Sequence, residues 1–227
     1  LAKALALRPA PLEQIAIEQW EPVARRLPDW VETIHGSING YGVQGYVVHD
    51  GTDALLIDTA YNAPAMIEFL STQRLRLIGI CLTHGHADHA DGIEQILKFH
   101  PATVYLGAED VDLLSWRPPQ AQLQAPIHGQ TIVVGRLAVH CLATPGHTPG
   151  GMCYRVDDPE APLCFVGDTL FAGSIGRSNP SELYQTHLAS IRTTVLGLPA
   201  EYRLLPGHGP ATTVEEELAH NPFVASA

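Results

Sequence analysis

The sequence lacks any apolar run long enough to cross a membrane, and it is poor in basic residues. A membrane-spanning helix needs roughly 18 or more consecutive apolar residues, and no segment of the 227 residues provides them. Lys and Arg number 13 against 24 Asp and Glu, which gives a net charge of −11 with histidine neutral. Because a surplus of carboxylates repels phosphate backbones, the composition argues against an integral membrane protein and against a general nucleic-acid binder. We expect a small-molecule substrate.

Cysteine is scarce, and no two cysteines form a C-x-x-C motif. Each cysteine lies in a strand-like apolar run, and free cysteine behaves as a small hydrophobic residue. We therefore expect reduced core residues at Cys81, Cys141, Cys153 and Cys164. The opening LAKALAL is too short and too weakly charged for a signal peptide, which favours a cytoplasmic location.

The order of apolar patterns predicts one α/β domain. Residues 1–37 are rich in proline near their start and show no clean period, so we expect an arm that packs on a domain of residues 38–227. Strand-like runs and helical spacings share that domain, without a fixed-period repeat or a low-complexity linker. This pattern suits two sheets packed face to face with helices outside, a four-layer αββα sandwich. Strands are predicted at 46–48, 54–57, 77–82, 103–106, 131–134, 137–142, 152–156, 163–166 and 203–205, and helices at 63–72, 93–99, 108–116, 182–196 and 214–220.

Histidine is nearly as frequent as the basic residues, with 12 His against 13 Lys and Arg. Four potential metal ligands lie within the segment THGHADH at 83–89, directly after a predicted buried strand. Alternate residues of an extended chain project to the same side, so His84 and His86 can bind one ion together. Asp88 and His89 fall where the chain turns toward the next helix, and they can face a second ion beside the first.

Three more candidate ligands follow predicted strands elsewhere in the chain. They are His147 in TPGHTPG, Asp168 in VGDT and His208 in PGHGP. The neighbouring glycines and prolines fix the turns and allow a close approach of the backbone. Since strand ends gathered at one edge of a sandwich can converge on one point, these residues complete a predicted binuclear metal site.

With its H-x-H-x-D-H motif and three distant partners, the sequence closely resembles the metallo-β-lactamase-fold hydrolase superfamily from about residue 38 to about residue 210. The resemblance implies the metallo-β-lactamase fold and a division of the ligands between two metals. On this view the first metal is held by His84, His86 and His147, the second by Asp88, His89 and His208, and Asp168 bridges the two. Asp58 in LIDT matches an acidic residue beneath the metal loop that orients one of the ligands.

The implied centre favours hydrolysis. Two divalent ions close together lower the pKa of a bridging water toward neutrality, so that a metal-bridging hydroxide is available, and one ion polarises the substrate carbonyl. Asp88 is placed to receive or relay a proton as well as to bind metal. Zinc suits a His/Asp shell, and binuclear sites rich in carboxylates also accept iron or manganese.

Two further segments narrow the resemblance to one branch. They are two pairs of motifs similar to those of the short single-domain relatives of glyoxalase II, the hydroxyacylglutathione hydrolases. The first pair is GDTLF at 167–171 with GSIGR at 173–177, and the second is GHGP at 207–210 with EELAHNPF at 216–223. This similarity implies that the substrate is a small thioester or ester. Arg177 could meet a substrate carboxylate through its planar fork of donors, and Tyr184 could line the substrate pocket.

Other activities fit parts of the same pattern. A persulfide dioxygenase would use one iron held by His84, His147 and Asp168, but this family usually continues Gly-Arg with Thr-Asp, where this chain has Ser-Asn. A lactonase shares the full ligand set. Class B3 β-lactamases are similar around the metal loop but lack an aspartate at the position of Asp168. A non-catalytic, metal-stabilised scaffold fits poorly because all seven ligand positions are filled.

Overall fold

The first β-sheet contains six strands that follow one another in chain order. The computed structural model describes residue 2 and residues 7–224. The strands of this sheet are β1 (Val31–Ile38), β2 (Tyr41–Asp50), β3 (Asp53–Ile57), β4 (Arg76–Cys81), β5 (Thr103–Tyr105) and β6 (Leu123–Gln124). Neighbours are antiparallel from β1 to β3 and parallel from β3 to β6. The turn between β2 and β3 contains Gly51 at φ 61°, a conformation that glycine adopts without a steric penalty.

The second sheet also has six strands, but their order in space differs from their order in the chain. Its strands are β7 (Thr131–Val134), β8 (Leu137–Ala143), β9 (Met152–Val156), β10 (Leu163–Gly167), β13 (Arg203–Pro206) and β14 (Thr212–Thr213), arranged as β14-β13-β10-β9-β8-β7. β10 and β13 are parallel, and every other pair is antiparallel. β8, β10 and β13 therefore run in one direction. Between β10 and β13, the strands β11 (Leu170–Phe171) and β12 (Ser174–Ile175) form a separate hairpin.

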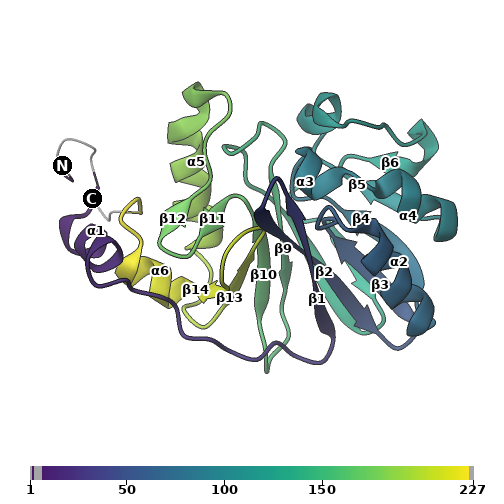
Figure 1. Ribbon diagram of the computed structural model, residues 1–227, viewed down its shortest axis with the longest axis horizontal. Coiled ribbons are helices and arrows are strands. Elements are labelled where there is room, and N and C mark those ends of the chain that lie inside the picture. Colours follow the sequence, from purple (N-terminus) through teal and green to yellow (C-terminus); the bar gives the residue numbers. More distant parts are fainter. Residues whose placement is uncertain (1, 3–6, 225–227) are drawn as a thin grey trace.

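Helices cover the outer faces of both sheets. They are α1 (Pro9–Ala16), α2 (Ala63–Thr72), α3 (Ala87–Ala90), α4 (Ile93–Phe99), α5 (Tyr184–Ser190) and α6 (Val214–His220). Figure 1 shows α2, α3 and α4 on one side of the pair of sheets and α1, α5 and α6 on the other. The predicted four-layer αββα sandwich is thereby confirmed.

The main apolar core lies between the two sheets. Leu55 from the first sheet and Tyr154 and Phe165 from the second are fully buried in it. A second apolar cluster includes Met66 of α2 and Ile96 of α4, which pack on the outer face of the first sheet. Each such side chain contributes about 1.5–3 kcal/mol through burial, so the sheets form a rigid support for the loops at their edges.

Two predictions drawn from composition have different outcomes. The four cysteines are free and buried, as predicted, at Cys81, Cys141, Cys153 and Cys164. Most of the opening LAKALAL lies outside the described residues, so the prediction made for it stays a prediction. None of the helices that the structure describes is long and apolar enough to cross a membrane.

The prediction for residues 1–37 needs correction. This range contains α1, and β1 begins at Val31, so the expected boundary between residues 37 and 38 falls inside an edge strand of the first sheet. In β1 only Val31 and Ile34 are buried. An edge strand with so few buried residues gives a weak alternating pattern, which explains why the sequence did not indicate it. The segment before β1 lies against α6, where Arg8 Nη1 donates to the carbonyl of Leu218 at 2.7 Å.

Two of the predicted helices are not regular α-helices throughout. The pattern at 182–196 forms a 3₁₀ turn at Ser181–Leu183, then α5, then a π-helical turn at Ile191–Val195. The π turn ends in the β-branched residues TTV, whose restricted χ1 angles disfavour a regular α-helix. The pattern at 108–116 forms a 3₁₀ helix at Ala108–Leu113. The Asp110 side chain in that 3₁₀ helix accepts hydrogen bonds from loops outside it.

Candidate metal centre

The predicted ligands lie at one edge of the sandwich, where strand ends from both sheets meet. β8, β10 and β13 run in one direction, and they are followed by His147, Asp168 and His208, respectively. β4 of the other sheet leads into the metal loop, residues 83–89. All seven predicted ligands fall into three overlapping groups, in each of which one ligand atom per residue lies within 4.8 Å of the others. The structure therefore brings together residues that are up to about 120 positions apart in the chain.

The first group contains His84, His86 and His147. His86 Nδ1 lies 3.1 Å from His147 Nε2. The ring of His84 is nearly perpendicular to both of the other rings, with interplanar angles of 89° to His86 and 90° to His147. Three imidazoles in this arrangement each present a nitrogen to one shared point, which is the donor set of a three-histidine zinc site.

The other ligands form a second set around Asp168. Its Oδ1 lies 3.3 Å from His89 Nε2, and its Oδ2 lies 3.6 Å from both His147 Nε2 and His208 Nε2. Asp88 Oδ2 lies 3.2 Å from His208 Nε2 and 3.7 Å from His89 Nε2. Asp168 thus faces His147 of the first group as well as His89 and His208.

Three buried polar atoms at this point have no hydrogen-bond partner among the described residues: His84 Nε2, His89 Nε2 and Asp168 Oδ1. An unpaired buried polar atom costs about 1–3 kcal/mol, so three of them in one place would be strongly destabilising. A cation bound to these atoms removes that cost. The imidazole and carboxylate donors match zinc, iron or manganese, and the residues therefore fit a metal centre.

Hydrogen bonds behind the histidines fix which ring nitrogen faces the centre. In four of the five histidines Nδ1 donates to an oxygen outside the centre, so Nε2 is the nitrogen that faces the centre. The acceptors are Thr83 Oγ1 for His84 at 3.1 Å, Asp58 Oδ2 for His89 at 2.8 Å, the Arg177 carbonyl for His147 at 2.7 Å and the Gly42 carbonyl for His208 at 2.6 Å. The histidines are thus preorganised as metal ligands.

The pKa shifts at the centre differ between the ligands. Burial and the neighbouring histidines hold the pKa of His84 well below its usual value, and burial lowers the pKa of His147 to about 4. Burial acts to raise the pKa of Asp88, but the hydrogen bond from His208 outweighs it, and the pKa falls to about 2. Near neutral pH His84 and His147 are therefore neutral and Asp88 is ionised, which are the forms that bind metal. Burial acts to lower the pKa of His89, but the Asp168 and Asp58 carboxylates raise it well above its usual value, and the hydrogen bond to Asp88 raises the pKa of His208.

Asp58 lies beneath the metal loop, where the resemblance placed it. Its Oδ1 accepts from Thr83 N at 2.7 Å, and its Oδ2 accepts from Thr83 Oγ1 at 2.7 Å and from His89 Nδ1 at 2.8 Å. Asp58 adopts a positive φ of 57°, a conformation that costs free energy in a residue other than glycine. The loop is thus held by one buried carboxylate in a strained backbone position.

Gly207 is required by the close approach of the chain to the centre. A Cβ on this residue would overlap the ring of His89 and lie 2.7 Å from Asp168 Oδ1. The glycine before His208 therefore allows the β13 end to come within reach of both groups of ligands, which a larger residue would prevent.

Two buried residues that support the site were not predicted from the sequence. Asp110 accepts hydrogen bonds from Gly85 N at 3.1 Å, Thr148 Oγ1 at 2.6 Å and Gly150 N at 2.7 Å, so it joins the metal loop to the loop that carries His147. The second residue is His187. It is buried, and its Nε2 donates to the carbonyl of Thr169 at 2.8 Å, next to Asp168. A lone acidic residue or histidine in a helical pattern gives no signal of such a role.

A pocket of about 540 Å³ adjoins the candidate centre and contains both residues predicted to bind substrate. It is lined by Ile175, Gly176, Arg177, Ser178, Ser181, Tyr184 and Phe223. Two contacts place it beside the centre. The carbonyl oxygen of Arg177 accepts a hydrogen bond from His147 Nδ1, and Gly176 is so close to His147 that a Cβ added to it would lie 3.0 Å from His147 Nδ1. Arg177 is exposed.

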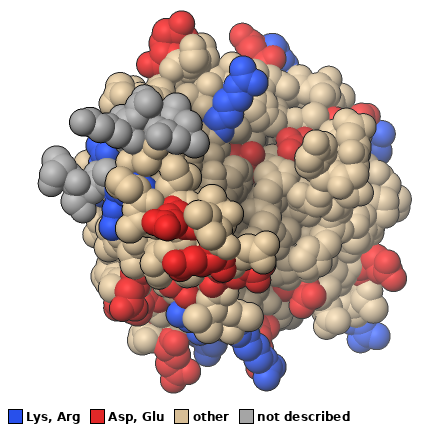
Figure 2. Space-filling model, turned by 60° about the vertical axis from the view of Figure 1, so that its left-hand side comes forward, with Lys and Arg blue, Asp and Glu red and all other residues tan. Residues whose placement is uncertain are grey.

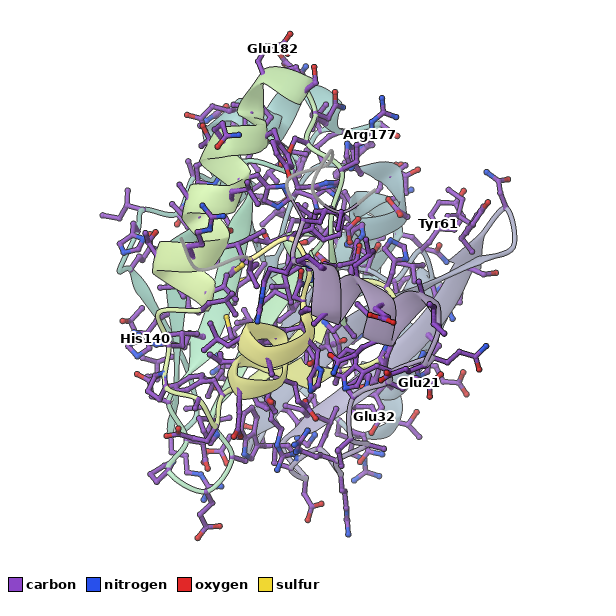
Figure 3. All side chains as sticks on the ribbon, turned by 90° about the vertical axis from the view of Figure 1, so that its left-hand side faces the viewer. Glu21, Glu32, Tyr61, His140, Arg177 and Glu182 are labelled. Carbon is purple, nitrogen blue, oxygen red and sulfur yellow. The ribbon has the colours of Figure 1, made fainter. Side chains whose placement is uncertain are left out.

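The views of this side of the molecule agree with an open site. Figure 2 shows a hollow in the surface, with acidic side chains visible inside it and a basic side chain at its rim. In Figure 3, Arg177 lies between Glu182, near the start of α5, and Tyr61. His140, a histidine that was not predicted as a ligand, lies on the opposite side of the view.

Comparison with known proteins agrees with this geometry. The sequence profile described as the Metallo-beta-lactamase superfamily matches residues 38–208. Hydroxyacylglutathione hydrolase GloC of Haemophilus influenzae is 33% identical over 193 residues, which cover 78% of this chain and 90% of that protein.

Two solved structures share the fold. The BLEG-1 B3 metallo-beta-lactamase has a TM-score of 0.74 and 27% identity, and the match covers 86% of this chain and 100% of that one. TTHA1623 in a di-iron-bound form has a TM-score of 0.71 and 30% identity, with 84% of this chain and 99% of that one covered. The fold, the converging ligands and these matches together show that the chain belongs to the metallo-beta-lactamase superfamily.

Proposed function

We propose that this chain is a hydrolase that uses two divalent metal ions to cleave a small thioester or ester. The observation that carries the proposal is the convergence of seven ligand side chains around buried atoms of His84, His89 and Asp168 that lack partners among the described residues. The similarity to hydroxyacylglutathione hydrolase GloC, whose substrate is by name a thioester, supports this choice of substrate class.

In the proposed site each ion has its own set of ligands. The first ion would be held by His84, His86 and His147, the second by Asp88, His89 and His208, and Asp168 would lie between them. Divalent ions bound there supply Lewis acidity that polarises a carbonyl and brings the pKa of a water toward neutrality. Zinc suits the donors, manganese is also compatible, and the similarity to a di-iron-bound protein keeps iron as a candidate.

Asp88 is the residue we propose to move the proton. Its carboxylate is only partly buried and is ionised, since its pKa is about 2, and it lies 3.2 Å from His208 Nε2. In the reaction the oxygen of water bonds to the acyl carbon and the bond from carbon to sulfur breaks. The proton that the water loses passes through the Asp88 carboxylate to the departing sulfur, so the products are an acid and a thiol.

The substrate would occupy the pocket beside the centre. Arg177 presents a planar, permanently charged group there, which pairs with a carboxylate on the substrate. Tyr184 forms part of the same lining and is 37% exposed, so its ring is available for contact. Because the pocket volume of about 540 Å³ lies within the usual range for small-molecule sites, a small anionic thioester fits.

The test combines metal analysis with a substrate panel. The protein is purified without chelators or added metal, its metal content is measured, and hydrolysis of S-lactoylglutathione, simple thioesters, a lactone and a β-lactam is then assayed. We expect about two ions per chain and the highest kcat/KM with thioesters. Asp88→Asn should lower kcat by about 10²-fold or more at full metal occupancy.

His140→Ala is the matched control, because His140 lies outside all three ligand groups. It should leave metal content and kcat unchanged, whereas His84→Ala should lower both. A fully loaded protein that hydrolyses none of the thioesters would refute the proposal. About one iron per chain together with oxygen uptake on a persulfide would replace it with the dioxygenase.

A further inference from the structure

The C-terminal segment, Glu217–Phe223, lies against the β11–β12 hairpin. This hairpin leaves the centre directly after Asp168 and returns to it at Gly176, which adjoins His147. The position of the hairpin therefore determines where the wall of the pocket stands relative to the ligands. The contacts that hold the hairpin in place therefore also shape the substrate pocket.

Two fully buried side chains of the C-terminal segment anchor the hairpin. The Glu217 carboxylate accepts from Gly173 N, with its two oxygens at 3.1 and 3.3 Å. Asn221 Nδ2 donates to the carbonyl of Ser174 at 2.9 Å and to Glu217 Oε2 at 2.7 Å. Thr212 Oγ1 also donates to Glu217 Oε1 at 2.7 Å. These hydrogen bonds join the hairpin to the segment, so the two form one unit.

The same asparagine sets the direction of the chain into Phe223. Asn221 Oδ1 accepts from Phe223 N at 3.0 Å. Phe223 then contributes to the lining of the pocket, together with Ile175 of β12 and Tyr184 of α5. The segment thus reaches from the anchored hairpin to the substrate pocket within seven residues.

The pocket lining combines one charge with apolar side chains. Among the described residues that line the pocket, Arg177 is the one charged residue, and Ser178 and Ser181 add hydroxyl groups. Ile175, Tyr184 and Phe223 offer hydrocarbon and aromatic surface. A ligand that matches both parts carries an anionic group for Arg177 and an apolar arm for the aromatic rings.

We propose that Phe223 is a specificity-determining residue, and that the C-terminal segment selects thioesters that combine an anionic thiol part with an apolar acyl arm of several carbons. This inference rests on the proposed thioester hydrolysis. The reaction itself is unchanged: water adds to the acyl carbon, the carbon–sulfur bond breaks, and the thiol leaves with the proton.

The experiment uses thioesters of 3-mercaptopropionate with acetyl, butyryl and hexanoyl groups, at equal metal loading. Each methylene buried against the apolar lining is expected to raise kcat/KM up to about fourfold in the unchanged protein. Phe223→Ala should lower kcat/KM for the hexanoyl substrate about tenfold or more and leave the acetyl substrate within about twofold. Phe223→Leu should restore most of the preference, since it keeps an apolar side chain.

Phe99→Ala is the matched control, because Phe99 lies on α4 and is 66% exposed. It should show the same chain-length preference as the unchanged protein. A Phe223→Ala protein with an unaltered preference would overturn the inference while leaving thioester hydrolysis intact.

A second measurement separates this result from a failure of the proposed function. The hexanoyl thioether analogue, which has no carbonyl group to hydrolyse, is titrated by calorimetry into the unchanged protein and into Phe223→Ala. Weaker binding by at least about fivefold in the variant supports the pocket assignment even if no thioester is turned over, and equal binding overturns it. Loss of hydrolysis of every thioester in the loaded, unchanged protein would refute the proposed function alone.

Discussion

Asp58→Asn tests the support of the candidate centre by exchanging one oxygen for an amide group of nearly the same size. Asp58 accepts three hydrogen bonds, two from Thr83 and one from His89. An asparagine has one acceptor oxygen and two donors, so it cannot replace both carboxylate oxygens. Either the new amide group faces Thr83 N, where two donors oppose each other, or it faces His89 Nδ1.

The second arrangement changes the ligand itself. If the introduced amide donates to His89 Nδ1, that nitrogen has to accept, and the proton moves to His89 Nε2. This is the atom that points to Asp168 and lacks a partner among the described residues. A protonated nitrogen cannot bind a metal ion. The first arrangement instead leaves a buried donor unsatisfied, at about 1–3 kcal/mol.

Both outcomes predict weaker binding of the second ion. Loss of a hydrogen bond that orients a metal-bound histidine lowers metal affinity about 10- to 100-fold, which corresponds to about 1.4–2.7 kcal/mol. The affinity is measured by competition with a chromophoric chelator, and the metal content by elemental analysis after dialysis. One ion per chain should be retained more tightly than the other.

Asp53→Asn is the control, since Asp53 lies at the start of the same strand β3 and forms only an ion pair with the exposed Arg76. It should bind both ions as the unchanged protein does. Equal affinity for both ions in Asp58→Asn would refute the reasoning, because it would show that the Asp58 contact to His89 does not control the ligand nitrogen.

Three further predictions follow from other contacts. Gly207→Ala should lower metal affinity at least about tenfold, because the added Cβ would overlap the ring of His89. The control Gly42→Ala, with nothing within 4 Å of an added Cβ, should retain both ions. Equal metal content in the two variants would contradict this prediction. Asp110→Ala should reduce the free energy of unfolding by about 2–4 kcal/mol in denaturant titration, because three buried donors lose a charged acceptor, and the exposed Asp112→Ala should change it by less than about 0.5 kcal/mol. Burial raises the pKa of Glu217 from 4.5 to about 7, so its contribution to stability is fully present below about pH 4.5 and is lost as the pH rises to about 7. Between about pH 5.5 and about pH 7.5, the free energy of unfolding of the unchanged protein should therefore fall relative to Glu217→Gln by about 2 kcal/mol, and a constant difference across this range would show that Glu217 does not titrate there.

Local sequence patterns were sufficient for most of the fold. Continuous apolar runs predicted strands such as β4 and β10, whose residues are largely buried, and helical spacing predicted α2, α4 and α6. The patterns failed where burial is one-sided or sparse. β1 has only two buried residues, and the short strands β11 and β12 have two residues each, so neither offers a period that can be recognised.

By itself the sequence determined which residue types are available for metal chemistry and that each follows a strand. That was possible because His147, Asp168 and His208 lie in short glycine- and proline-rich turns that local patterns reveal. Only the tertiary structure decided which atoms meet, because the direction of a side chain depends on contacts from distant strands. The role of Asp110 between two loops, the carbonyl partners that orient His147 and His208, and the reach of Phe223 into the pocket all arise from pairs that are many residues apart, and a linear pattern carries no record of such contacts.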